Sequence, residues 1–143
     1  MKTVKTRIFG SLVMALLLIT TACLPNQVIV DDTIQIGAIL ILSGVGSNWG
    51  EDTQKGMELA KDHINRNGGL LGKNLSIIYE DNPGDDAKTA LSALQSLKIR
   101  GIDMIVGTTW SGSGKAVAPV ACEEKILMIS PSLGVADFNE RCL

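Results

Sequence analysis

Four short aliphatic runs alternate along the chain with longer segments in which apolar residues return every three or four positions. The runs are predicted as β-strands over residues 34–42, 75–79, 104–106 and 126–129. The longer segments are predicted as amphipathic helices over residues 51–66, 87–100 and 115–124. Glu51 and Asp52 are expected at the positive N-terminal end of the first helix.

The predicted order is β-α-β-α-β-α-β, and the connections are too long for hairpins. Right-handed crossovers then give an α/β fold, a parallel sheet with helices on both faces. Ligands of such sheets bind outside the carboxyl ends of the strands. The loops expected at that edge are residues 43–50, 80–85, 107–114 and 130–135.

Composition divides the 143 residues into two unlike parts. Residues 1–22 contain Lys2, Lys5 and Arg7, then an uncharged stretch too short to span a bilayer, which predicts a secretory signal peptide. Residues 23–33 are expected to be a polar tether and residues 34–143 the folded domain. Without the signal, the formal charge of −2 becomes −5. The chain has no basic excess, so a nucleic-acid partner is not predicted.

Three cysteines have separate contexts. Cys23 directly follows Thr20-Thr21-Ala22 and resembles the lipidated cysteine of bacterial lipoproteins, which implies attachment to the membrane through acyl chains. Thr20 departs from that pattern, which usually has Leu there, so cleavage without lipidation stays open. Cys122 and Cys142 could form a disulfide in an export compartment or remain unrelated thiols.

Two glycine-rich loops resemble nucleotide-binding motifs without matching them. In the loop 107–114, Lys115 is followed by Ala116 rather than Ser or Thr, and Thr109 stands where a P-loop has its first glycine. In the loop 44–50, the third glycine comes one residue late for a dinucleotide fingerprint. A Rossmann-type NAD-dependent oxidoreductase is therefore only an alternative hypothesis.

Residues suited to catalysis or metal binding are sparse. His63 is the single histidine, so neither a hydrolytic triad nor a histidine metal site can be assembled. The spacing of Asp81, Asp85 and Asp86 fits neither an EF-hand nor paired catalytic carboxylates, and favours a solvated turn and a helix N-cap. We expect no enzymatic activity, no metal and no cofactor.

Several segments together resemble the leucine/isoleucine/valine-binding proteins, the type I periplasmic substrate-binding proteins of ABC transporters. These are IQIGAIL at 34–40, NWG at 48–50, KGMELA at 55–60, INRNGGLLGK at 64–73 and ISPS at 129–132. The resemblance spans about residues 34–138 and implies a two-lobed clamshell. Such a protein closes on a small solute, usually an amino acid or related amide, outside the cytoplasm and delivers it to an ABC permease.

The resemblance also implies a ligand-binding set: Trp49, Ser111, Gly112, Ser113, Ser132 and Gly134. Trp49 matches an aromatic wall of the pocket. Ser111 matches the hydroxyl that binds the ligand carboxylate, supported by the helix N-terminus at Ser113. Ser132 matches a position whose backbone meets the ligand's polar end. Gly134 departs from the family, which commonly has Thr or Ser there, so the ligand need not be a branched-chain amino acid. Both tryptophans, Trp49 and Trp110, are expected in loops at this edge.

The 121 residues after the signal are too few for two lobes. We therefore expect part of the N-terminal lobe of a lipid-anchored solute-binding protein, a fragment or prematurely ended product with weak or absent solute affinity alone. A sensory ectodomain of the same fold is an alternative, and the solute stays open.

Overall fold

The computed structural model describes residues 33–135. The predicted signal peptide, the candidate lipidation site Cys23 and Cys142 lie outside the described residues. Cys122, in the last turns of helix α4 (Ser111–Glu123), is disulfide-bonded.

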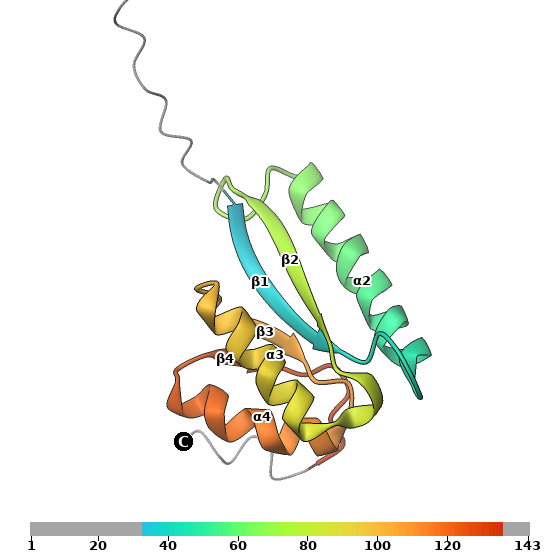
Figure 1. The fold of residues 1–143 in the computed structure, drawn as a ribbon. Helices are drawn as coiled ribbons and strands as arrows, with labels where there is room; N and C mark the ends of the chain where they lie inside the picture. Colours follow the sequence, from blue (N-terminus) through green and yellow to red (C-terminus); the bar gives the residue numbers. More distant parts are fainter. Residues whose placement is uncertain (1–32, 136–143) are drawn as a thin grey trace, which may run out of the picture. The chain divides into compact units, whose positions relative to one another are not determined.

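The sheet has four strands in the order β2-β1-β3-β4, and every pairing is parallel. The strands are β1 (Thr33–Leu40), β2 (Asn74–Asp81), β3 (Met104–Gly107) and β4 (Leu127–Ile129). Each crossover contains a helix, as Figure 1 shows. The predicted α/β fold with a parallel sheet is confirmed.

The helices are α2 (Ser47–Arg66), α3 (Ala87–Ile99) and α4 (Ser111–Glu123), with a short 3₁₀ turn, η1 (Pro83–Asp85), before α3. The predicted starts of the first and third helices are wrong: α2 and α4 each begin four residues earlier. Both early turns are rich in glycine and serine, which are weak helix formers, so the pattern there predicted loops. Glu51 and Asp52 consequently lie beyond the first turn of α2, not at its positive end.

The helices cover opposite faces of the sheet. On β2, Ile78 packs into the core beneath α3 and α4, whereas the neighbouring Tyr79 donates a hydrogen bond to Glu58 of α2 at 2.9 Å. Successive strand residues point to opposite faces, so α2 lies on one side and α3 and α4 on the other (Figure 1). Burial and the bond to Glu58 raise the pKa of the Tyr79 hydroxyl.

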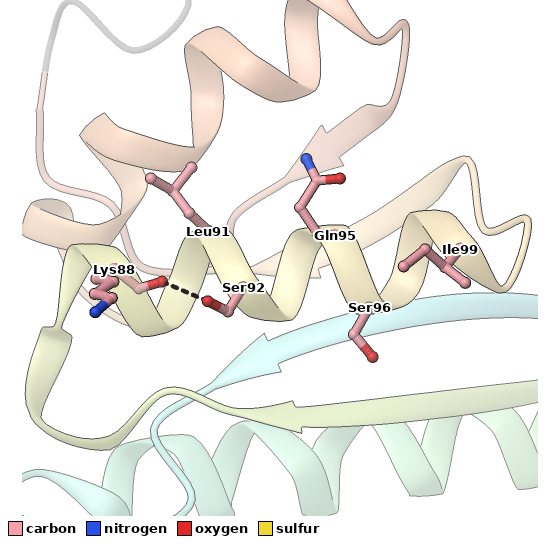
Figure 2. Close-up of a pocket in the computed structure, with 6 residues that line it drawn as sticks. All are labelled: Lys88, Leu91, Ser92, Gln95, Ser96 and Ile99. Atoms are coloured by element: carbon pink, nitrogen blue, oxygen red, sulfur yellow. Dashed lines mark hydrogen bonds between the residues drawn. The ribbon is translucent and has the colours of Figure 1, made fainter.

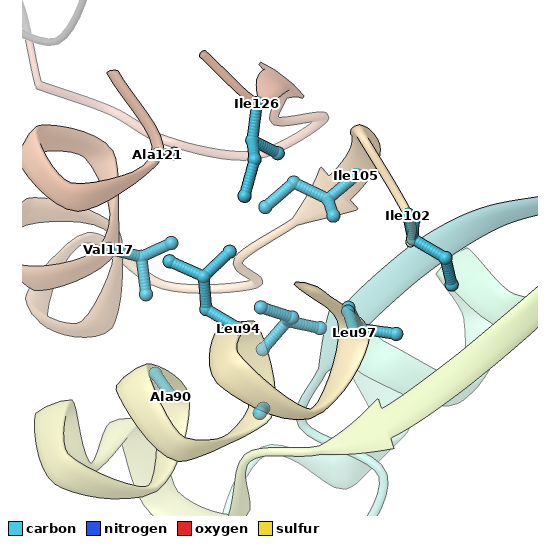
Figure 3. Close-up of a cluster of buried hydrophobic side chains, with 10 residues drawn as sticks. Ala90, Leu94, Leu97, Ile102, Ile105, Val117, Ala121 and Ile126 are labelled. Carbon is cyan, nitrogen blue, oxygen red and sulfur yellow. The ribbon is translucent and has the colours of Figure 1, made fainter. Parts of the chain in front are cut away.

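The main core lies between the sheet and the helices α3 and α4. Leu94 and Leu97 of α3 are fully buried against Ile39 of β1 and Ile105 of β3, and Val117 of α4 closes the cluster (Figure 3). Burying each such side chain contributes about 1.5–3 kcal/mol, so this layer fixes where α3 and α4 sit on the sheet.

The face opposite this core is covered unevenly. Asn65 of α2 holds the start of β2 through two bonds to Leu75, from its Nδ2 to the carbonyl at 2.9 Å and from the Leu75 amide to its Oδ1 at 2.7 Å. Over β4, in contrast, Leu127 and Ile129 are 55% and 60% exposed. Within residues 33–135, none of the helices combines the length and apolar character needed to cross a bilayer.

The first turn of α2 packs directly on the end of β1, and this generates a stability prediction. A Cβ added to the buried Gly50 would lie 1.9 Å from the Ile41 carbonyl oxygen, whereas Gly56, later in α2, has open space around it. We expect Gly50→Ala to lower the free energy of unfolding by about 2–4 kcal/mol. Gly56→Ala, the matched control, should raise it by about 0.5–1 kcal/mol through helix propensity. Urea denaturation followed by circular dichroism measures both, and equal effects would contradict this packing.

Candidate functional site

The connections that follow the four strands lie at one edge of the sheet, as predicted, because all strands run parallel. We call it the carboxyl edge; it comprises residues 41–46, 82–86, 108–110 and 130–135 and the first turns of α2 and α4. Hydrogen bonds join these segments. The Ile41 amide donates to Thr109 Oγ1 at 3.0 Å, and Ser132 Oγ donates to the Thr109 carbonyl at 2.6 Å.

Two tryptophans form an aromatic wall at the carboxyl edge. Their rings meet edge to face, with centroids 5.6 Å apart and an interplanar angle of 80°. Trp49 lies in the first turn of α2 and is 57% exposed, so the expectation that it lies in a loop is wrong. Trp110 directly precedes α4. The wall needs glycine at position 46, since a Cβ there would lie 2.5 Å from Trp110 Cζ2.

The first turn of α4 contains Ser111, Gly112 and Ser113, so these predicted ligand residues do lie together at a helix N-terminus. A side chain of the protein already binds there. Asp85 accepts hydrogen bonds from the Gly112 amide at 3.1 Å, from the Ser113 amide at 2.8 Å and from Ser113 Oγ at 2.6 Å. The expectation that Asp85 belongs to a merely solvated turn is wrong, because its carboxylate caps α4 from 28 residues away.

Asp81 makes a similar link between two neighbouring segments of the carboxyl edge. Its carboxylate accepts hydrogen bonds from the Leu42 amide at 2.8 Å, the Ser43 amide at 3.2 Å and the Ser43 hydroxyl. Asp81 therefore joins the end of β2 to the connection after β1, and was missed as a structural link by sequence reasoning. For all three predicted acids, the side chain binds backbone amides.

The third acid confirms the predicted helix N-cap. Asp86 precedes α3, and its Oδ2 accepts from Thr89 Oγ1 at 2.7 Å and the Thr89 amide at 2.6 Å. These bonds stabilise the ionised form and lower the pKa of Asp86.

The segment after β4 is held by its serines. Ser130 Oγ donates to the Thr108 carbonyl at 3.0 Å, so this serine and Ser132 both tie the segment to the connection after β3. Gly134 is exposed, and a Cβ added there would meet nothing within 4 Å. The Cβ of the hydroxyl-bearing residue that the family commonly has would therefore fit without a clash.

Two polar side chains at the carboxyl edge are buried without a hydrogen-bond partner, and one of them, Asn82, was missed by sequence reasoning. Asn82 is fully buried, yet neither its amide nitrogen nor its oxygen has a hydrogen-bond partner. The indole nitrogen of Trp110 is likewise buried and unpartnered. Unsatisfied buried polar groups are rare in folded proteins and are often explained by a bound molecule or function. In the sequence, Asn82 appears only as an ordinary turn residue, so nothing there could have revealed it.

A shallow hollow of about 720 Å³ runs along the outer face of α3, as Figure 2 shows. Its lining residues are Lys88, Leu91, Ser92, Gln95, Ser96 and Ile99. None of the six predicted ligand residues lines it, so it is separate from the carboxyl edge.

Metal ligands do not gather in the described part of the chain: residues 33–135 hold no cluster of three or more His, Cys, Asp or Glu side chains suited to a metal ion. His63 is exposed near the end of α2, as expected for a helix surface residue.

Comparison with known proteins finds a matching family, related sequences and similar structures. The profile of a family described as periplasmic binding protein matches residues 33–142. The Leu/Ile/Val-binding protein BraC3 of Rhizobium johnstonii is 33% identical over 110 residues, which cover 77% of this chain and 30% of that protein. The Leu/Ile/Val-binding protein of Escherichia coli is 28% identical over 116 residues, covering 81% and 31%.

Solved structures share the fold. The branched-chain amino acid transporter substrate-binding protein LivJ of Streptococcus pneumoniae, crystallised with isoleucine, superposes with a TM-score of 0.70 at 30% identity, covering 76% of this chain and 31% of that one. A solute-binding protein of Rhodopseudomonas palustris, crystallised with 3,4-dihydroxybenzoic acid, has a TM-score of 0.68 at 23% identity, covering 77% and 30%.

The chain thus spans about 30% of the length of the relatives it matches. The family profile covers all of the described residues, and the sheet and its helices superpose on substrate-binding proteins from several bacteria. The chain belongs to the periplasmic binding protein family, with the type I fold.

Proposed function

We propose that this chain is part of the N-terminal lobe of a solute-binding protein that delivers an amino acid or related amide to an ABC permease. The observation that carries the proposal is the carboxyl edge, where an exposed aromatic wall lies beside the N-terminus of α4. Family membership and relatives named for binding leucine, isoleucine and valine support it.

The carboxyl edge offers the two kinds of contact that a small solute needs. Trp49 presents a large, partly exposed ring, on which an apolar side chain of the ligand can be desolvated. Ser111 brings a hydroxyl and a backbone amide in the first turn of α4, and Ser132 lies on the neighbouring segment. A few polar groups around an apolar wall are typical of small-molecule sites.

Tight binding in this proposal depends on a second lobe. Proteins of the clamshell type enclose a ligand by hinge closure of two domains, and one open edge leaves much of the ligand in water. The described residues form one sheet with its helices. We therefore expect weak solute affinity for this chain alone and full affinity only where both lobes are present.

The proposed location is outside the cytoplasm, on the membrane surface. Its support is the basic and apolar leader of residues 1–22 followed by Cys23, together with the family's periplasmic role. A lipidated Cys23 and the tether after it would hold the lobe near its permease.

The enzyme alternative loses support from the comparisons. The named relatives are binding proteins of transporters.

The first prediction concerns ligand contacts. In the protein carrying both lobes, Trp49→Ala should weaken binding of leucine or leucinamide about tenfold, because a central aromatic contact is lost. Ser111→Ala should weaken it about fivefold through a lost hydrogen bond. Titration calorimetry measures both. Leu59→Ala on α2 and Ser92→Ala on α3, both exposed and outside the carboxyl edge, are matched controls that should bind normally. Normal affinity in both site variants would rule out this binding site.

The second prediction concerns the anchor. Cys23→Ala should move the protein from the membrane fraction to the soluble fraction, because the acyl chains attach there. Fractionation and immunoblotting of the exporting cell measure this, with Leu59→Ala, an exposed position on α2, as the control that should stay membrane-bound. A cleaved Cys23→Ala protein that remains on membranes would contradict anchoring through this residue.

A further inference from the structure

A side chain of the protein itself, the Asp85 carboxylate, already binds part of the N-terminus of α4. Helix N-termini attract anions because their first backbone amides lack partners within the helix. In α4, two of those amides, from Gly112 and Ser113, donate to Asp85, and the next, from Gly114, bonds back to the Trp110 carbonyl at 3.2 Å. Of the first-turn amides, that of Ser111 remains.

The remaining charges at the carboxyl edge do not favour an anion. No charged residue occurs in the segments 41–46, 108–110 and 130–135. In the segment 82–86 the charged residues are both acidic, Asp85 and Asp86. Asp81 at the end of β2 adds a further carboxylate. The nearest cations along the chain are Lys88, which lines the hollow outside α3, and the exposed Lys115. Among the described residues of the carboxyl edge, a ligand carboxylate at α4 would thus meet the charge of Asp85 and no cationic side chain.

Hydrogen bonds hold Asp85 at the N-terminus of α4 even though its own backbone conformation is an uncommon one. It has a positive φ of 63°, a conformation that is unfavourable for a non-glycine residue. Three hydrogen bonds to α4 compensate for that cost. The residue before α4, Trp110, provides no side-chain cap, so the carboxylate that caps this helix comes from the loop before α3.

We propose that Asp85 is a specificity-determining residue of the ligand site, selecting a carboxamide over a free carboxylate at the N-terminus of α4. This inference rests on the proposed function. A carboxamide oxygen can accept from Ser111, while its NH₂ group can donate to Asp85 Oδ2, which accepts one hydrogen bond from residues 33–135, that of the Gly112 amide. A free carboxylate has no proton to donate and must displace Asp85 or lie against its charge.

The first test needs no knowledge of the ligand and uses acetate as the carboxylate probe. The ¹⁵N-labelled chain is titrated with sodium acetate against sodium chloride of equal ionic strength, and the amide resonances of Gly112 and Ser113 are followed by NMR. We expect them to stay unmoved in the native chain and to shift saturably in Asp85→Ala. Asp86→Ala, one residue further along, is the matched control and should behave as the native chain.

Two outcomes of the acetate titration would overturn the proposal. One is an equal acetate response in the native chain; the other is a folded Asp85→Ala variant whose Gly112 and Ser113 amides do not respond. If Asp85→Ala does not give a folded spectrum, Asp85→Asn, which keeps the shape and removes the charge, is judged by the same criteria.

The second test measures selectivity in the protein with both lobes. Leucine and leucinamide differ at the carboxyl end, and we expect the native protein to prefer leucinamide. Asp85→Ala should shift the ratio of the two affinities toward leucine about tenfold or more. An unchanged ratio would overturn the proposed role. If neither compound nor any other amino acid or amide binds, the proposed function is wrong, and the acetate titration still decides whether Asp85 closes α4 to carboxylates.

Discussion

The loops at the carboxyl edge depend on hydrogen bonds that backbone amides donate to carboxylates. A parallel sheet brings the loops to one edge, but it does not set their distances from one another. Asp81 binds the connection after β1, and Asp85 binds the first turn of α4. Charge-assisted bonds of this kind are about twice as strong as neutral ones. The short segment between these two acids therefore acts as a clasp, and both neighbouring loops take their positions from it.

The clasp can set the positions of both loops because the apolar layer between the sheet and the helices α3 and α4 is closely packed. Leu94 and Leu97 fill the space between the sheet and α3, and Val117 packs α4 against the same cluster. Close packing of this kind leaves little room for a helix to slide. The start of α4 is thus fixed from below by apolar contacts and from above by Asp85, so this part of the carboxyl edge is preorganised.

Sequence patterns predict the fold better than the site. The alternation of aliphatic runs and amphipathic segments predicted all four strands and their succession along the chain, because this alternation is a local signal. The starts of α2 and α4 were misplaced, since the glycines and serines of those turns become helical only through packing, as at Gly50 against Ile41. The link from Asp85 to Ser113 joins residues 28 positions apart, and no spacing in a single sequence encodes such a pair. The resemblance to binding proteins supplied the candidate ligand residues, but did not reveal that Asp85 already binds the N-terminus of α4.

The aromatic wall has a spectroscopic consequence. The chain contains two tryptophans, and both lie in this wall with their rings in edge-to-face contact. Intrinsic tryptophan fluorescence therefore originates at the carboxyl edge, with no background from indoles elsewhere in the chain. Trp49 is partly exposed while the Trp110 indole nitrogen is buried, so the two rings have different polarity around them. Emission wavelength and the near-ultraviolet dichroism of the coupled pair can thus report events at the site without an introduced label.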